Sequence, residues 1–168
     1  MGSNNFRKKP LQFYMRDKNN FLRTRYFNNC FMKYDKLTIF TDGGARGNPG
    51  PAGIGAVILG EKGKAIAKIS KYIGETTNNQ AEYKALIAAL TKAKEIGARE
   101  LEVFLDSELV VKQLNRQYRV KDKDLAPLFV SVYNLSLGFK RIAFKHIRRE
   151  KNKLADKLVN LALDRAGK

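Results

Sequence analysis

The sequence predicts an α/β domain: a mixed five-stranded sheet, three antiparallel strands plus two parallel ones, flanked by helices. Two observations lead to this fold class. The elements expected in residues 37–166 follow the order β-β-β-α-β-α-α-β-α. Three strands joined by short turns favour antiparallel pairing, whereas later strands that follow helices add in parallel. A chain of 168 residues, 43% of them hydrophobic, is also long enough to bury one core.

The first three strands are expected between residues 37 and 73. Residues 37–42 (LTIFTD) are largely apolar, and the GGARGNPGPAG segment after them predicts a loop because glycine and proline dominate it. Residues 53–60 and 64–73 predict two further strands. The EKGK sequence between them favours a tight turn and therefore a hairpin.

Helices and strands alternate in the rest of the chain. Apolar residues recur at helical spacing from Tyr83 onward, and Gly97 predicts a helix C-cap. The expected elements are a helix at 78–96, a strand at 100–105, helices at 107–117 and 124–137, a strand at 140–146 and a helix at 152–166.

The charge is far from balanced. The chain has 33 Lys and Arg against 16 Asp and Glu, a formal net charge of +17. This excess favours a polyanionic partner, and nucleic acid is the commonest. The alternative is a basic, solvated surface without a partner.

Several protein classes are excluded or disfavoured. The single cysteine, Cys30, excludes an intramolecular disulfide and a cysteine-based zinc site. No stretch approaches 18 apolar residues, so we expect no membrane span. The N-terminus lacks the continuous apolar run of a secretory signal, so we expect a cytoplasmic protein.

Residues 1–36 differ from the rest and are predicted to be an N-terminal extension. They hold nine Lys and Arg and two Asp, and aromatic residues are interleaved with these charges. Aromatic and basic side chains together bind nucleic acid by stacking and phosphate contact. A flexible leader, or aromatics that pack on the domain, are the alternatives.

Four carboxylates, Asp42, Glu82, Asp106 and Asp156, lie beside or within apolar segments. An unpaired charge is costly to bury. Four acids in such places of a basic chain therefore indicate a functional role. Clustered carboxylates suit a hard divalent cation such as Mg²⁺ or Mn²⁺. The four therefore predict a metal-dependent enzyme that acts on an anionic substrate.

Each carboxylate also has a structural explanation. Asp42 precedes a glycine pair and is a common turn former. Glu82 is a favourable charge near a helix N-terminus, and Asp106 is a plausible helix N-cap. Asp156 is explained equally well as a solvated flank of the last helix.

Short amide side chains lie near the same elements. They are Asn48, Asn78, Asn79 and Gln80. Amides can read sugar hydroxyls and base edges in a minor groove, although loop chemistry and helix capping are the alternatives for Asn48 and Asn78. The GGARGNPG run is not a nucleotide-binding P-loop, because it lacks the Gly-Lys-Ser/Thr ending and no helix follows it.

The only histidine, His146, ends the last predicted strand and precedes a basic segment. A histidine near a metal site can move protons or assist product release. The basic side chains around it, Arg148, Arg149, Lys151 and Lys153, either contact phosphates or are solvated.

Together these segments resemble the type 1 ribonuclease H family. The resemblance covers residues 37–166 and rests on TDGGARGNPGPAGIGAV, TTNNQAEYKAL, FLDSELVV and HIRREKNKLADKLVN, in the family's order. It implies a ribonuclease H-like fold for a catalytic domain at 37–168. The implied activity is endonucleolytic cleavage of the RNA strand of RNA–DNA hybrids.

The resemblance also implies residue roles. The four carboxylates would hold two Mg²⁺ ions, with Asp42 as the bridging ligand, and the products would carry 5′-phosphate and 3′-hydroxyl ends. His146 matches the family's loop histidine, and Asn152 falls where the family often has an asparagine. The residues implied to approach the substrate are Gly43, Gly44, Asn48, Asn78 and Gln80 on the RNA strand and Thr77 near a DNA phosphate.

The sequence departs from the family at three points. Glu108 stands where some members have Gln, and its carboxylate either repels phosphate or faces solvent. The chain has no tryptophan and no long basic insertion of the kind that grips the hybrid in some bacterial members; the extension at 1–36 is a candidate substitute. We expect a monomer. The competing functions are a non-catalytic hybrid- or RNA-binding domain and another nuclease of the same fold superfamily.

Overall fold

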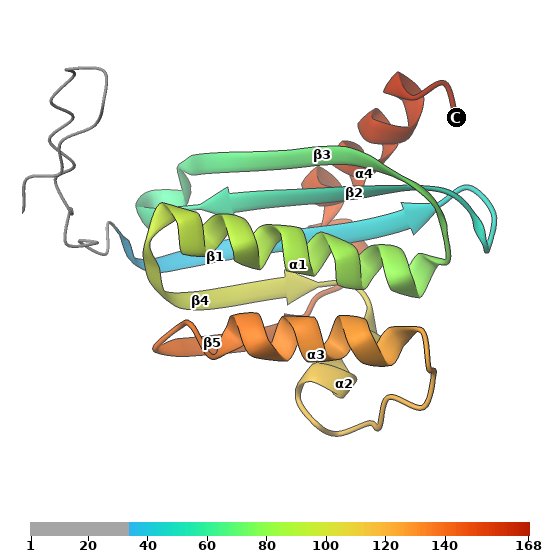
Figure 1. Ribbon diagram of the computed structural model, residues 1–168. Helices are drawn as coiled ribbons and strands as arrows, with labels where there is room; N and C mark the ends of the chain where they lie inside the picture. Colours follow the sequence, from blue (N-terminus) through green and yellow to red (C-terminus); the bar gives the residue numbers. More distant parts are fainter. Residues whose placement is uncertain (1–33) are drawn as a thin grey trace, which may run out of the picture. The chain divides into compact units, whose positions relative to one another are not determined.

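The computed structural model describes residues 34–168, and these form one mixed sheet with helices on both faces (Figure 1). The predicted extension lies outside the described residues except for residues 34–36, which belong to the first strand. The strands are β1 (Tyr34–Ala45), β2 (Gly50–Leu59), β3 (Ala65–Thr76), β4 (Ala98–Leu105) and β5 (Arg141–His146). The helices are α1 (Asn78–Ile96), α2 (Glu108–Leu114), α3 (Leu125–Ser136) and α4 (Lys153–Arg165), with short 3₁₀ turns η1 (Glu61–Gly63) and η2 (Arg149–Lys151).

The strand order is β3-β2-β1-β4-β5. β1 pairs antiparallel with β2, and β2 pairs antiparallel with β3. β4 pairs parallel with β1 and with β5, because a helical connection precedes each of these later strands. The predicted mixed sheet of three antiparallel and two parallel strands is therefore confirmed.

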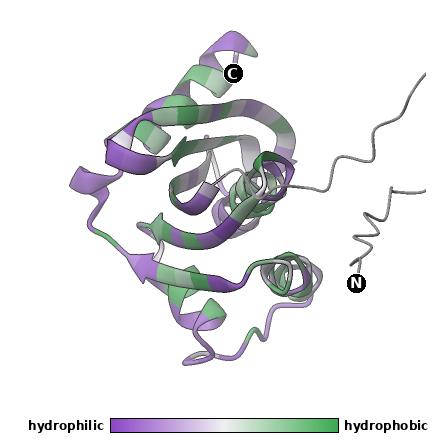
Figure 2. Ribbon diagram, turned by 90° about the vertical axis from the view of Figure 1, so that its left-hand side faces the viewer, coloured by the Kyte–Doolittle hydropathy of each residue, from purple (hydrophilic) through white to green (hydrophobic). Residues whose placement is uncertain are grey.

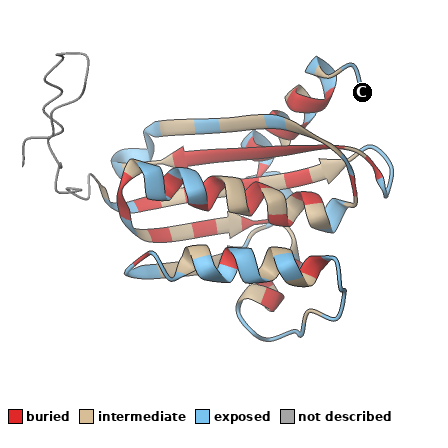
Figure 3. Cartoon of the chain, viewed as in Figure 1, coloured by how far each residue is buried: buried red, intermediate tan, exposed pale blue. Residues whose placement is uncertain are grey.

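Helices cover the two faces of this sheet unequally. α1 packs on β1 and β2 and also contacts α3, while α4 packs on the opposite face over β2 and β3 (Figure 1). β2 lies between these helical layers and is buried along almost its whole length (Figure 3). Hydrophobic residues gather where the helices face the strands (Figure 2).

The main core lies between α1 and the sheet. Its largest fully buried side chains include Tyr83 and Leu86 of α1 and Leu37 and Ile39 of β1. The Tyr83 hydroxyl donates a hydrogen bond to Gln113 Oε1 at 2.8 Å, so this buried polar group of α1 is paired with α2.

Helix α1 matches its prediction at both ends. Thr77 is the N-cap, and its hydroxyl accepts a hydrogen bond from the Gln80 N–H. Gly97 ends the helix with φ 84°, in the left-handed region that glycine adopts without strain. The capping alternative for Asn78 is wrong, because Thr77 takes that position.

Two predicted boundaries are wrong. The glycine-rich segment is not a long loop, because β1 continues to Ala45 and β2 already begins at Gly50. The helix expected at 107–117 ends at Leu114, because Arg116 adopts φ 60° and cannot continue a helix. No helix within residues 34–168 is long and apolar enough to cross a membrane.

Candidate active site

Asp42 lies on β1, three residues before the strand ends, and pairs in register with Gly55 of β2. The pKa of its carboxyl is raised to about 6, first by burial and then by the nearby charges of Asp106 and Asp156. The Gly43 N–H and the Arg149 guanidinium oppose this rise. Asp42 is thus a strand residue rather than the turn former of the alternative reading.

Glu82 faces Asp42 because α1 and β1 approach each other very closely. A Cβ on Gly43 would lie 2.2 Å from the Ala81 carbonyl carbon and 2.4 Å from the Glu82 nitrogen, so only glycine fits there. Burial raises the pKa of Glu82 to about 7, a hydrogen bond from Ser107 lowers it, and the charge of Asp42 raises it. Its Oε2 atom is buried without a hydrogen-bond partner.

Asp106 follows β4 directly and is held by a buried side chain. Asn152, which is 1% exposed, donates from Nδ2 to Asp106 Oδ1 and to the Thr41 carbonyl, both at 2.9 Å. The N-cap of α2 is Ser107, whose hydroxyl accepts from the Val110 N–H. The capping alternative for Asp106 is therefore wrong.

Asp156 lies in the first turn of α4, and that helix is docked through glycine. A Cβ on Gly55 would meet the Ala155 carbonyl oxygen at 2.3 Å, so α4 rests directly on the β2 backbone beside Asp42. Arg149 forms an ion pair with Asp156 at 2.9 Å, and the Asn160 amide donates to Asp156 Oδ2 at 3.2 Å. Asp156 is therefore not a merely solvated flank.

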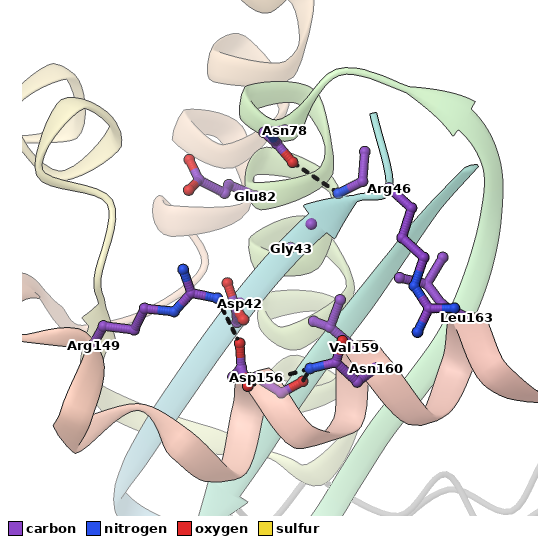
Figure 4. A pocket seen from close by; sticks show the side chains of 12 residues that line it. Asp42, Gly43, Arg46, Asn78, Glu82, Arg149, Asp156, Val159, Asn160 and Leu163 are labelled. Carbon is purple, nitrogen blue, oxygen red and sulfur yellow. Dashed lines mark hydrogen bonds and ion pairs between the residues drawn. The ribbon is translucent and has the colours of Figure 1, made fainter. Parts of the chain in front are cut away.

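Three of the four carboxylates line one open pocket beside β1 (Figure 4), and Asp106 lies outside that lining. Asp42, Glu82 and Asp156 reach it from three different elements, and Arg149 extends toward Asp42 and Asp156. The residues that line it are Asp42, Gly43, Gly44, Ala45, Arg46, Asn78, Glu82, Arg149, Asp156, Val159, Asn160 and Leu163.

The donor set fits a divalent cation. All the acids are oxygen ligands, and Glu82 Oε2 has no hydrogen-bond partner. The pKa values of Asp42 and Glu82 are raised first by burial and then by the neighbouring negative charges. As they stand, no three His, Cys, Asp or Glu side chains in residues 34–168 are spaced to hold an ion. Two of the acids have other partners, because Asn152 donates to Asp106 and Arg149 pairs with Asp156.

The predicted substrate residues divide into two groups. Gly43, Gly44 and Asn78 line the pocket, whereas Asn48 supports it from the hairpin. Asn48 Oδ1 accepts from the Asn78 N–H at 3.1 Å, and Asn78 Oδ1 accepts from the Ala45 N–H at 2.7 Å. The two amides thus tie the β1–β2 turn to the start of α1.

Thr77 and Gln80 lie beside this pocket rather than in its lining. Gln80 Oε1 accepts a hydrogen bond from the Thr76 hydroxyl, and its backbone N–H is capped by Thr77. Asn79 is exposed in the first turn of α1.

His146 is exposed at the end of β5 and does not line the pocket. Its charge acts on Glu108, whose pKa is lowered first by the hydrogen bond from Lys112. Lys112 also pairs with Glu108 at 2.6 Å, so the carboxylate that departs from the family pattern faces solvent and is neutralised.

Sequence reasoning missed how three residues act in the site. Asn152 was known only from its family position, Arg149 only as one of several basic side chains, and Ser107 was not singled out. An asparagine just before an apolar helical stripe is a usable signal for Asn152. The Arg149–Asp156 contact depends on the η2 turn and has no simple sequence signal.

Comparisons with known proteins agree with this geometry. Residues 40–162 match the family model described as reverse transcriptase-like. The bifunctional protein Rv2228c of Mycobacterium tuberculosis is 45% identical over 132 residues, which cover 78% of this chain and 36% of that protein. Ribonuclease HI of Halobacterium salinarum is 44% identical over 131 residues, 78% of this chain and 66% of the archaeal protein. The chain thus spans about a third of the length of the mycobacterial protein.

A solved structure is similar over nearly its whole length. LC11-RNase H1, isolated from compost by a metagenomic approach, has been solved in complex with an RNA/DNA hybrid. That structure is 49% identical, with a TM-score of 0.75, and the match covers 79% of this chain and 99% of the other.

Proposed function

Because this chain belongs to the type 1 ribonuclease H family, we propose that it cleaves the RNA strand of RNA–DNA hybrids as a metal-dependent endonuclease. One observation carries the proposal. Carboxylates from β1, α1 and α4 line one pocket, the charge of Asp106 at the end of β4 acts on Asp42 and Glu82, and the pKa values of these two acids are raised. A basic protein that gathers acids in this way is suited to a cation and a polyanion at once.

Divalent metal ions are the family's general cofactor, and we infer that Mg²⁺ is the ion used here. Asp42, Glu82, Asp106 and Asp156 would hold two ions, with Asp42 between them because it faces the other acids from the central strand. When bound, such ions activate water for in-line attack and stabilise the leaving oxygen. The expected products carry 5′-phosphate and 3′-hydroxyl ends.

The protein's own groups would select and orient the hybrid. Gly43 and Gly44 leave the strand surface open beside Asp42, and Asn78 presents its amide at the pocket wall. Contacts of these residues, Asn48 and Gln80 with 2′-hydroxyls would select RNA for cleavage. The Thr77 hydroxyl, which accepts from the Gln80 N–H at the start of α1, can donate its own proton to a phosphate of the DNA strand.

His146 would serve as a mobile proton carrier rather than as a fixed ligand. It is exposed at the end of β5, before the η2 turn that carries Arg149. An exposed imidazole near reacting groups can serve as a general acid or base. Monomeric state and cytoplasmic location stay predictions.

The deciding experiment compares the wild-type protein with Asp42→Asn on a labelled RNA–DNA hybrid, in Mg²⁺ and in Mn²⁺. We expect cleavage to fall by about 100-fold or more in Asp42→Asn, because a central metal ligand is lost, while hybrid binding persists. DNA duplex, RNA duplex and single-stranded RNA are the control substrates.

Each alternative has its own outcome. A hybrid-binding domain without activity would bind the hybrid and cleave it under neither metal. Another nuclease of this fold superfamily would cleave the DNA duplex. Either result would overturn the proposal.

A further inference from the structure

Arg149 brings a positive charge into the carboxylate cluster. Its Nη2 lies 2.9 Å from Asp156 Oδ1, the only ion pair within residues 34–168 that involves one of the four acids. The pKa of Arg149 is raised by this hydrogen bond and by the charges of Asp156, Asp42 and Asp106. The guanidinium is therefore a counter-ion to three carboxylates at once.

The Arg149–Asp156 ion pair is exposed enough for another cation to replace Arg149. The Arg149 side chain is 77% exposed and that of Asp156 is 31% exposed, so the pair stands at the rim of the pocket (Figure 4). Exposed ion pairs contribute little to stability, and releasing one side chain into water costs little. By contrast, the Asn152 side chain that holds Asp106 is itself buried and lacks this freedom.

The pair also occupies ligand atoms of Asp156. Oδ1 accepts from Arg149 and Oδ2 accepts from Asn160. Before Asp156 can give an oxygen to a metal ion, the guanidinium has to leave or the carboxylate has to turn. Two cations thus compete for one carboxylate.

We propose that Arg149 is a built-in competitor of the metal: in the metal-free protein it neutralises Asp156, and a divalent ion must displace it to bind. This inference rests on the proposed metal-dependent function. Arg149 lowers the repulsion among Asp42, Asp106 and Asp156 when no ion is present, and it weakens the affinity for the ion by the same interaction.

Calorimetric titration with Mn²⁺, without nucleic acid, tests this inference on the full chain. We expect Arg149→Gln to tighten Mn²⁺ binding about two- to fivefold, the effect of losing one exposed ion pair. Arg149→Lys keeps the charge and should stay near the wild-type affinity. Arg148→Gln is the matched control, because it removes an equal charge one residue away that makes no ion pair within the described residues.

The outcomes separate this inference from the proposed function. Unchanged or weaker Mn²⁺ binding in Arg149→Gln, or equal tightening in Arg148→Gln, would overturn the competitor role even if the wild type cleaves hybrids. Tighter binding in Arg149→Gln alone would support it even if no substrate is cleaved. No Mn²⁺ binding by either protein would overturn the competitor role, whereas the proposed function is decided by the cleavage of the labelled hybrid.

Discussion

The charge of this site depends on the protonation of single residues. Asp42 and Glu82 have pKa values of about 6 and about 7 in the folded protein, mainly because they are buried. In the unfolded chain such groups titrate near 4. Between these values the folded state binds more protons than the unfolded state, so the metal-free protein gains stability as the pH falls.

We therefore expect the free energy of unfolding of the metal-free protein to rise by about 2–4 kcal/mol between pH 8 and pH 5 on account of these two acids. Urea denaturation in EDTA at several pH values measures it. The double variant Asp42→Asn, Glu82→Gln is the control for all other titrating groups. If the variant shows the same pH dependence as the wild type, the two acids do not carry the effect.

Asn152 contacts three elements of the fold, so we expect its substitution to affect stability as well as the site. Its amide holds Asp106 and the Thr41 carbonyl, and its backbone carbonyl accepts from the Asp156 N–H at 3.1 Å. It thus joins the ends of β1 and β4 to the start of α4.

Asn152→Ala should lower the free energy of unfolding by about 1–3 kcal/mol, because buried acceptors lose their donor. Asn160→Ala removes an exposed amide from Asp156 and should cost less than about 0.5 kcal/mol. Chemical denaturation of both variants gives the comparison, and equal costs would contradict the difference in burial.

At this site the helices lie directly against the strand backbone, because glycine has no side chain to keep them apart. Gly43 lets β1 touch α1, and Gly55 lets α4 touch β2, so Glu82 and Asp156 arrive on opposite sides of Asp42. The distances that matter for the site are set by these backbone approaches.

Gly43→Ala should therefore be far more harmful than Gly44→Ala. The added methyl group at 43 would lie 2.2 Å from the α1 backbone, whereas at 44 it would meet the Val159 side chain at 3.5 Å, an ordinary contact. We expect a loss of about 3 kcal/mol or more for Gly43→Ala and less than about 1 kcal/mol for Gly44→Ala. Thermal unfolding with circular dichroism measures both; similar losses would mean that β1 and α1 can move apart.

The same glycines explain which parts of the fold the sequence could predict. Helix α1 was predictable to the residue because Thr77 and Gly97 signal its ends locally. The sequence pattern around Gly43 and Gly44 predicted a loop. The neighbouring residues cannot show whether a glycine forms a turn or lets a helix pack against the strand. The carboxylates were predictable as acids in apolar surroundings, but the contacts of Asn152 and Arg149 join segments that only folding brings together.

The net positive charge of the molecule is divided between the described domain and residues 1–33. Residues 34–168 hold 25 basic and 15 acidic side chains, so +10 of the net charge of +17 belongs to the described domain. The rest lies in residues 1–33, where the sequence predicts a nucleic-acid-binding extension.

Deleting residues 1–33 should weaken hybrid binding and flatten its dependence on salt, because fewer phosphates are neutralised. The deletion stops at 33 because Tyr34 already belongs to β1. Fluorescence anisotropy at several salt concentrations measures the slope of log K against log salt. An unchanged affinity and slope would mean that the extension is not a substitute for the missing basic insertion.

The position of Asp156 on α4 has a consequence for the protein during its own synthesis. Asp42, Glu82 and Asp106 emerge from the ribosome before α4, which can dock on β2 only after every strand of the sheet has been made. Domains acquire non-local contacts late, after the local ones. A nascent chain would therefore have its sheet before it has its fourth carboxylate, so the complete set of four acids forms only after α4 has docked.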